Sequence, residues 1–89
     1  MNKSELIEEV SSVTGHKSSY VTEVVNCLFD MMVTSLVETG QVKISGFGTF
    51  FVHNKSARTA RNPRTGEKVM VPEKKVPKFK ASRVLKEAL

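Results

Sequence analysis

Residues 53–76 of the chain read HNKSARTARNPRTGEKVMVPEKKV, a long segment with many basic and few large apolar side chains. At its middle, Asn62-Pro63-Arg64-Thr65-Gly66 has the composition of a turn, because proline fixes one φ and glycine accepts a positive one. On the return, Val69 and Val71 alternate with other residues until Pro72 interrupts the pattern, as an edge strand or bulge allows. The segment predicts a basic two-stranded β-ribbon that has no core of its own.

Residues 41–52, which precede the ribbon, predict a β-hairpin. Val42 and Ile44 alternate with polar residues, the pattern of a half-buried strand. Gly46-Phe47-Gly48 suits a tight reversal with the phenyl ring turned into the core, and residues 49–52 form the returning strand.

The first 40 residues predict two helices. Asn2 is a good N-cap, Glu5 follows at the spacing of a capping box, and apolar residues recur at helical intervals until Gly15. Ser18 or Ser19 is expected to cap a second, longer helix that ends at Gly40.

The apolar residues of the second helix cover an arc of roughly 240°, far more than one buried face requires. The first helix covers one side. The most economical cover for the other side, in a chain of 89 residues, is a second copy of the protein.

Residues 77–89 return the chain to the body. Pro77-Lys78-Phe79-Lys80 brings back an aromatic ring, and Ser82 is expected to cap a short final helix with Val84, Leu85 and Ala88 facing inward. We expect one domain over residues 1–89. It divides into a helical dimerisation base (1–40), a body of sheet and C-terminal helix (41–52 and 76–89) and a basic β-ribbon arm (53–75).

Charge is strongly segregated along the chain. The formal net charge is +5, but residues 1–52 carry three basic and six acidic side chains, whereas residues 53–89 carry eleven basic and three acidic ones. Such a lopsided distribution favours a polyanionic partner over a merely solvated face.

The chemistry of catalysis is poorly represented, so we do not expect an enzyme, a metal site or a cofactor. Cys27 is the single cysteine, which rules out an intramolecular disulfide and a four-cysteine zinc site. His16 and His53 have no partners at catalytic spacing, and Gly46 and Gly48 lack the third glycine of a dinucleotide fingerprint.

No targeting segment is expected. The opening residues Met1–Glu5 lack the apolar stretch of a secretory signal, and no run approaches the roughly 18 apolar residues of a membrane span. We therefore expect a cytoplasmic protein without a membrane partner.

The ribbon carries the binding chemistry. Guanidinium groups suit the narrow, electronegative minor groove of DNA, and a rigid apolar ring such as Pro63 at a cationic tip can act as a wedge between base pairs. Basic side chains lie along the ribbon and near its return to the body: Lys55, Arg58, Arg61, Arg64, Lys68, Lys74, Lys75, Lys78, Lys80 and Arg83.

Three motifs together resemble the HU/integration host factor family of bacterial histone-like DNA-binding proteins. They are Gly46-Phe47-Gly48-Thr49-Phe50, the stretch Arg58 to Gly66 (RTARNPRTG), and Val76-Pro77-Lys78-Phe79. The resemblance implies an α+β fold with a two-helix hairpin base, a three-stranded antiparallel sheet, a long protruding β-ribbon arm and a short C-terminal helix. It also implies an intertwined dimer whose two arms embrace double-stranded DNA in the minor groove.

The family's roles can be placed on matching positions. The resemblance implies that Pro63 intercalates and that DNA is contacted by Lys3, Lys55, Arg58, Arg61, Asn62, Pro63, Arg64, Lys75, Lys80, Arg83 and Lys86. A dimer core of Leu28, Met32, Leu36, Ile44, Phe47, Phe50 and Phe79 is expected. The chain departs from the family pattern at Ala60 and Ser82, where glycine is usual, and at Glu67 and Glu73, which add acids to the arm.

HU-like members bind DNA with little sequence preference and favour bent, nicked or distorted duplexes. The chain resembles HU more than integration host factor, so we expect a nucleoid-associated homodimer that bends and compacts DNA. The alternatives are a sequence-preferring factor of the integration host factor type, a helix-turn-helix regulator and a small hydrolase or nuclease. The sequence leaves open a heterodimer with a paralogue and the binding of RNA.

Overall fold

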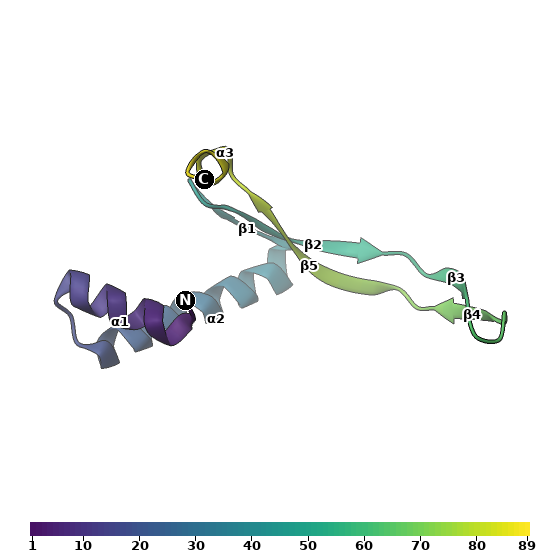
Figure 1. The fold of residues 1–89 in the computed structure, drawn as a ribbon, viewed down its shortest axis with the longest axis horizontal. Coiled ribbons are helices and arrows are strands. Elements are labelled where there is room, and N and C mark those ends of the chain that lie inside the picture. Colours follow the sequence, from purple (N-terminus) through teal and green to yellow (C-terminus); the bar gives the residue numbers. More distant parts are fainter.

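The computed structural model describes residues 1–89 as an elongated chain with extents of 60 × 29 × 28 Å. The elements in order are α1 (Lys3–Thr14), α2 (Ser18–Thr39), β1 (Gln41–Ile44), β2 (Gly48–Lys55), β3 (Arg58–Arg61), β4 (Lys68–Val71), β5 (Lys74–Ala81) and α3 (Arg83–Glu87). The helical pair α1–α2 lies at one end, the sheet with α3 in the middle and the β3–β4 arm at the other end (Figure 1).

The first helix follows its sequence signals. The Oδ1 atom of Asn2 accepts a hydrogen bond from the backbone N–H of Glu5, which confirms the N-cap. Gly15 ends α1 with a left-handed φ of 74°. The pair α1–α2 buries Ile7 and Val21, the two buried hydrophobic side chains of the chain.

The start of α2 differs from the expectation. Neither serine caps the helix: α2 begins at Ser18, and its N-cap is Lys17, which makes no side-chain cap hydrogen bond. The hydroxyl of Ser18 instead donates to Oε1 of Glu8 over 2.9 Å, which ties the beginning of α2 to α1. The other end is as predicted, because Gly40 ends the helix with a φ of 78°.

Much of the α2 surface has no cover within the chain. Leu28 is 55% exposed, and Val24, Phe29, Met31, Val33 and Val37 are exposed as well. By length and composition α2 could cross a membrane, with a mean hydropathy of 1.3. The expectation from the sequence concerned a continuous run of apolar residues, and α2 contains none of that length because Glu23, Asn26 and Asp30 interrupt it. A core helix covered from two sides meets the same criteria.

The three-stranded antiparallel sheet has the order β1-β2-β5. β1 pairs with β2 through Val42 opposite Phe50, and β2 pairs with β5 through Phe50 opposite Phe79. The ring centroids of Phe50 and Phe79 are 4.7 Å apart, and those of Phe47 and Phe79 are 5.5 Å apart. Phe47 is still 45% exposed, so its ring is only partly turned into the core of a single chain.

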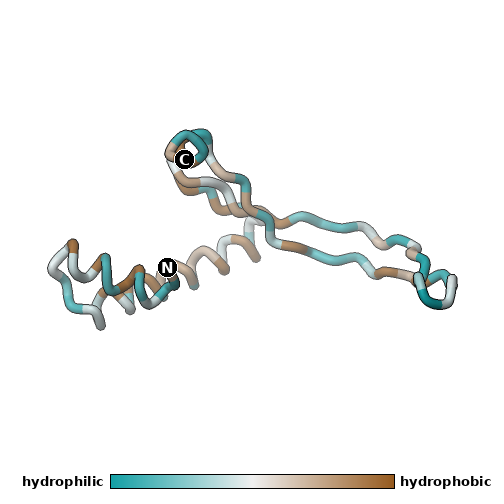
Figure 2. The backbone as a smooth tube through the Cα atoms, in the orientation of Figure 1, coloured by the Kyte–Doolittle hydropathy of each residue, from teal (hydrophilic) through white to brown (hydrophobic).

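The arm is a second antiparallel pair, β3 with β4, in which Arg58 lies opposite Val71 and Arg61 lies opposite Lys68. The residues of β3 are mainly hydrophilic, whereas β4 carries a hydrophobic stretch, Val69 to Val71 (Figure 2). The predicted interruption at Pro72 is present on both strands, since residues 56–57 and 72–73 separate the arm from the sheet.

The final helix is capped as expected, with the hydroxyl of Ser82 accepting from the backbone N–H of Leu85. Its side chains do not all face inward. Val84 is 62% exposed, because α3 extends away from α1 and α2 (Figure 1) and meets no helix of its own chain.

The chain exposes much more surface than a compact monomer. Its accessible surface is 7651 Å², whereas a folded monomer of this mass exposes about 5,200 Å². Its radius of gyration is 19.1 Å, whereas a compact domain of this length has about 12 Å.

Candidate nucleic-acid interface

The pairing register divides the sheet into two faces of opposite character. Successive side chains of a strand point to opposite faces, and residues paired across strands share a face. One face carries Val42, Ile44, Gly48, Phe50, Val52, Pro77, Phe79 and Ala81, together with Asn54 and Lys75. We call it the apolar face. The other carries Gln41, Lys43, Thr49, Phe51, His53, Lys55, Lys74, Val76, Lys78 and Lys80, and we call it the cationic face.

The cationic face continues into the arm without a change of register. Each strand has two residues between sheet and arm, so the register that pairs Lys55 with Lys74 also pairs Arg61 with Lys68. Within the arm, pairing and alternation place Thr59, Arg61, Lys68 and Met70 on one face and Arg58, Ala60, Val69 and Val71 on the other. Counted by alternation across the two-residue gaps, the first set continues the cationic face and the second the apolar face. Seven cations and no carboxylate therefore share one face from the body almost to the tip.

Hydrogen bonds within the tip shape its turn. The Oδ1 atom of Asn62 accepts from the backbone N–H of Arg64 over 2.9 Å, an Asx turn, and the Asn62 carbonyl accepts from the N–H of Gly66 over 2.8 Å. Gly66 has a φ of 73°, a conformation that other residues adopt at a cost. The turn leaves Pro63 exposed at the end of the arm.

The structure brings together only part of the set of DNA contacts expected from the sequence. Lys55, Arg61 and Lys80 lie on the cationic face, whereas Arg58 and Lys75 lie on the opposite side of the same strands. Asn62, Pro63 and Arg64 form the tip.

The remaining expected contacts lie outside the sheet. Lys3 is on α1, where its Nζ donates to Oδ1 of Asn26 over 2.6 Å and lies 5.5 Å from the ring centroid of Phe29. Arg83 is on α3 and forms an exposed ion pair with Glu87 (Nε to Oε1, 2.9 Å). Such an exposed pair contributes little to stability. Lys86 is exposed on the same helix.

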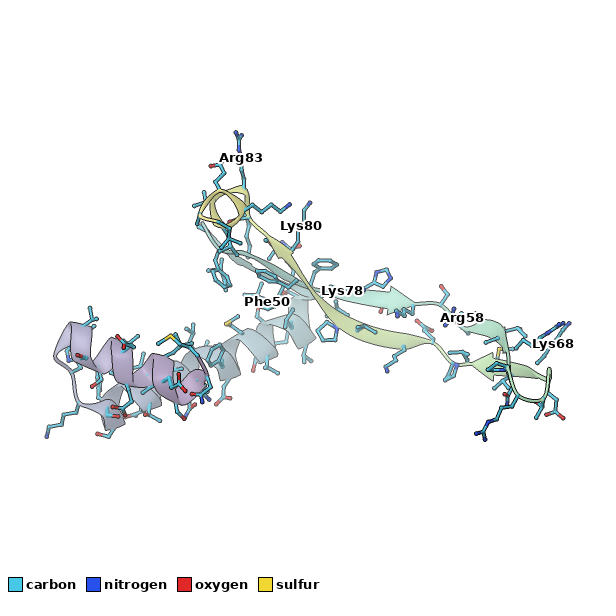
Figure 3. All side chains as sticks on the ribbon, in the orientation of Figure 1. Phe50, Arg58, Lys68, Lys78, Lys80 and Arg83 are labelled. Carbon is cyan, nitrogen blue, oxygen red and sulfur yellow. The ribbon has the colours of Figure 1, made fainter.

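Four cations of this face were not among the contacts that the resemblance implies, although three of them, Lys68, Lys74 and Lys78, were placed on or near the ribbon from composition. The fourth is Lys43. The sequence predicts that Lys43 points away from the core, because it alternates with Val42 and Ile44. Only the strand order shows that it lies on the same face as the lysines of β5. Figure 3 shows Lys80 and Arg83 projecting away from the two long helices, and Arg58 and Lys68 on the distal arm.

The expected dimer core is incompletely covered within one chain. Met32, Leu36, Ile44 and Phe50 are half-buried, and Leu28, Phe47 and Phe79 are exposed. Nearby, a groove of about 590 Å³ lies between the end of α2 and the root of the arm. Its lining includes Val33, Val37, Val52, Val76 and Pro77.

No cluster of three or more His, Cys, Asp or Glu side chains is placed to hold a metal ion. Cys27 is exposed and unpaired on α2.

The family model described as "Bacterial DNA-binding protein" matches residues 1–89. The chain belongs to this family. One curated relative of this chain is "DNA-binding protein HU-1" of Halalkalibacterium halodurans. The two are 43% identical over 89 residues, which span all of this chain and 99% of the relative. The "Integration host factor subunit alpha" of Anaeromyxobacter sp. is 39% identical over all of this chain and 79% of the relative.

A solved structure of the family has the same fold. The cocrystal structure of Anabaena HU with DNA superposes with a TM-score of 0.87 at 30% identity, covering 99% of this chain and 96% of that one. The fold class is therefore confirmed: a mixed helix and strand chain with a three-stranded antiparallel sheet and a short C-terminal helix.

Proposed function

We propose that this protein is a histone-like architectural protein that binds double-stranded DNA through the cationic face and the arm tip. The observation that carries this proposal is the set of seven cations that strand pairing and alternation place on one face of the sheet and arm: Lys43, Lys55, Arg61, Lys68, Lys74, Lys78 and Lys80. Each of these cations that meets a phosphate releases a counterion, so the affinity is largely electrostatic and independent of sequence. The function requires no catalytic group.

The active form is a homodimer. The chain exposes about 2,400 Å² more than a compact monomer of its mass, partly in the arm and partly on the open side of α2. Obligate homodimer interfaces bury roughly 2,000–5,000 Å² in total and are rich in apolar side chains. A second copy supplies that cover for Leu28, Met32, Leu36, Ile44 and the phenylalanine cluster. A heterodimer with a paralogue would use the same surface.

Two arms of one dimer enter the minor groove, and Pro63 inserts between base pairs. Unstacking a base step costs a few kcal/mol, and the bent duplex offsets this cost by touching more of the protein. Exposure of Pro63 at the end of a turn held by Asn62 supports this role.

The chain divides by task into a dimerisation base (1–40), a body (41–52 and 76–89) and an arm (53–75). β2 and β5 continue past the body to Lys55 and Lys74, so the proximal arm is part of the same sheet. The protein works on the chromosome in the cytoplasm, as a nucleoid component.

Bent, nicked or otherwise distorted DNA is bound in preference to straight duplex. A site that is already distorted lowers the deformation free energy that the protein must supply. The 39% identity to an integration host factor subunit favours a second candidate, a DNA-bending factor with a preferred sequence.

The experiment titrates the protein against an end-labelled duplex and the same duplex with a nick, at several salt concentrations. Affinity and end-to-end FRET are read together, and an RNA duplex of the same sequence tests RNA binding. We expect affinity to fall about 10³-fold or more between 50 and 200 mM salt, as for six or more phosphate contacts. Nicked DNA should bind more tightly and bend more. Strong preference for one intact sequence would favour the second candidate.

The wedge is tested separately with Pro63→Ala, using Pro77→Ala as the matched control because Pro77 lies on β5 opposite Val52, outside the arm. Pro63→Ala should reduce bending more than affinity, and Pro77→Ala should bend DNA as the unmodified protein does. Equal bending by the Pro63 variant and the unmodified protein would reject the wedge.

A further inference from the structure

Met70 is a large apolar side chain on the cationic face of the distal arm. It is 69% exposed and lies opposite Thr59, with Lys68 and Arg61 next along the same face toward the tip. The other large apolar residues of this part, Val69 and Val71, lie on the opposite face. A single exposed apolar residue is ordinary on a protein surface. The position of Met70 is informative because it continues the surface proposed to meet DNA.

We propose that Met70 is a DNA contact that packs against the C–H edges of deoxyribose in the walls of the minor groove. The inference rests on the proposed function, since it needs the arm to lie in that groove. The flanking cations, Lys68 and Arg61, fix the face that turns toward the duplex, and Met70 is carried there with them. A groove about 6 Å wide brings its sugar walls close to any side chain that enters it.

The thioether suits this surface. Methionine is unbranched and polarizable, so it adapts to irregular apolar contours such as the ridges between successive sugars. The contact adds affinity by removing apolar surface from water and releases no counterion. Its contribution is therefore the same at low and high salt, unlike that of each neighbouring cation.

The adjacent residue Val69 provides a matched control, because it is 47% exposed on the same strand but points to the other face. The unmodified protein and the variants Met70→Ala and Val69→Ala are titrated against one duplex at several salt concentrations. Met70→Ala should weaken binding about fivefold at every salt concentration, because the variant buries roughly 40 Å² less apolar surface when it binds the duplex. Val69→Ala should change affinity less than twofold.

A gain of charge tests the same geometry in the opposite direction. Met70→Lys should steepen the slope of log affinity against log salt by about 0.9, the effect of one added phosphate contact. Val69→Lys should leave the slope unchanged. Circular dichroism of each variant checks that the fold is retained; both positions are exposed on the arm.

Equal effects of the two alanine variants, or of the two lysine variants, would overturn the role of Met70 while leaving the proposed function intact. Failure of the unmodified protein to bind the duplex at low salt would instead overturn the proposed function. The two failures are therefore distinguishable within one set of titrations.

Discussion

Gly48 is the glycine at which an added methyl group should lower the stability of the fold most. It is the one buried residue of the sheet, and it lies opposite Ala81 where β2 meets β5. A Cβ atom added there would lie 2.5 Å from Cζ of Phe79 and 2.6 Å from the backbone carbonyl oxygen of Lys80. The phenyl ring could move only by giving up its packing against Phe50, and the carbonyl only by displacing β5.

The size of the effect follows from these contacts. Overpacking of a close-packed site costs about 1–3 kcal/mol, and the upper end applies where backbone must move. Displacement of Phe79 adds the loss of part of its aromatic pairing, about 0.5–1.5 kcal/mol per pair. We expect Gly48→Ala to lower the free energy of unfolding by about 3 kcal/mol.

The measurement is urea unfolding followed by circular dichroism at one fixed protein concentration, because the stability of a dimer depends on concentration. Gly46→Ala is the control. Gly46 has a left-handed φ of 75° but no atom within 4 Å of an added Cβ, so its substitution should cost only about 1–2 kcal/mol of backbone strain. A loss for Gly48→Ala no larger than that for Gly46→Ala would refute the steric argument.

Three further predictions test the interface and the arm. Leu28→Lys places a charge on the uncovered side of α2, so sedimentation equilibrium should show loss of the dimer; an unchanged dimer mass would contradict the proposed interface. Asn62→Ala removes the Asx turn at the tip and should reduce FRET bending, while the melting temperature stays within a few degrees because the tip lies outside the core; full bending would contradict it. Arg61→Gln should lower the slope of log affinity against log salt by about 0.9. Arg58→Gln, on the opposite face of the same strand, should lower it less; equal slopes for the two variants would show that the face assignment is wrong.

Local signals predicted most of the elements. Asn2, Gly15, Gly40 and Ser82 mark helix ends where the sequence places them, because caps and left-handed glycines act within one turn of the chain. The start of α2 was predicted wrongly for a tertiary reason: Ser18 bonds to Glu8, ten residues earlier, and no local pattern contains that contact.

The binding face was less predictable than the fold. Basic side chains could be assigned to the ribbon from composition, but the side on which each lies depends on register. A single bulged residue near Pro72 would have moved Lys68 to the other side of the arm relative to Lys74, away from Arg61. The resemblance to a known family predicts Arg58, Arg61 and Lys75 together as DNA contacts. Strand pairing places Arg61 on the cationic face and Arg58 and Lys75 on the opposite face.

The interruption between sheet and arm reconciles two demands on the ribbon. An arm that enters a groove must bend relative to the body, yet its cations must stay on the side that faces the duplex. Residues 56–57 and 72–73 leave the ladder at the same level on both strands, and Pro72 has no backbone N–H to donate there. Because the two gaps are equal in length, the chain can change direction without changing register. One extra residue in the gap of a single strand would have placed Arg61 and Lys68 on opposite faces, so the equal gaps are what allow the arm to change direction and keep one cationic face.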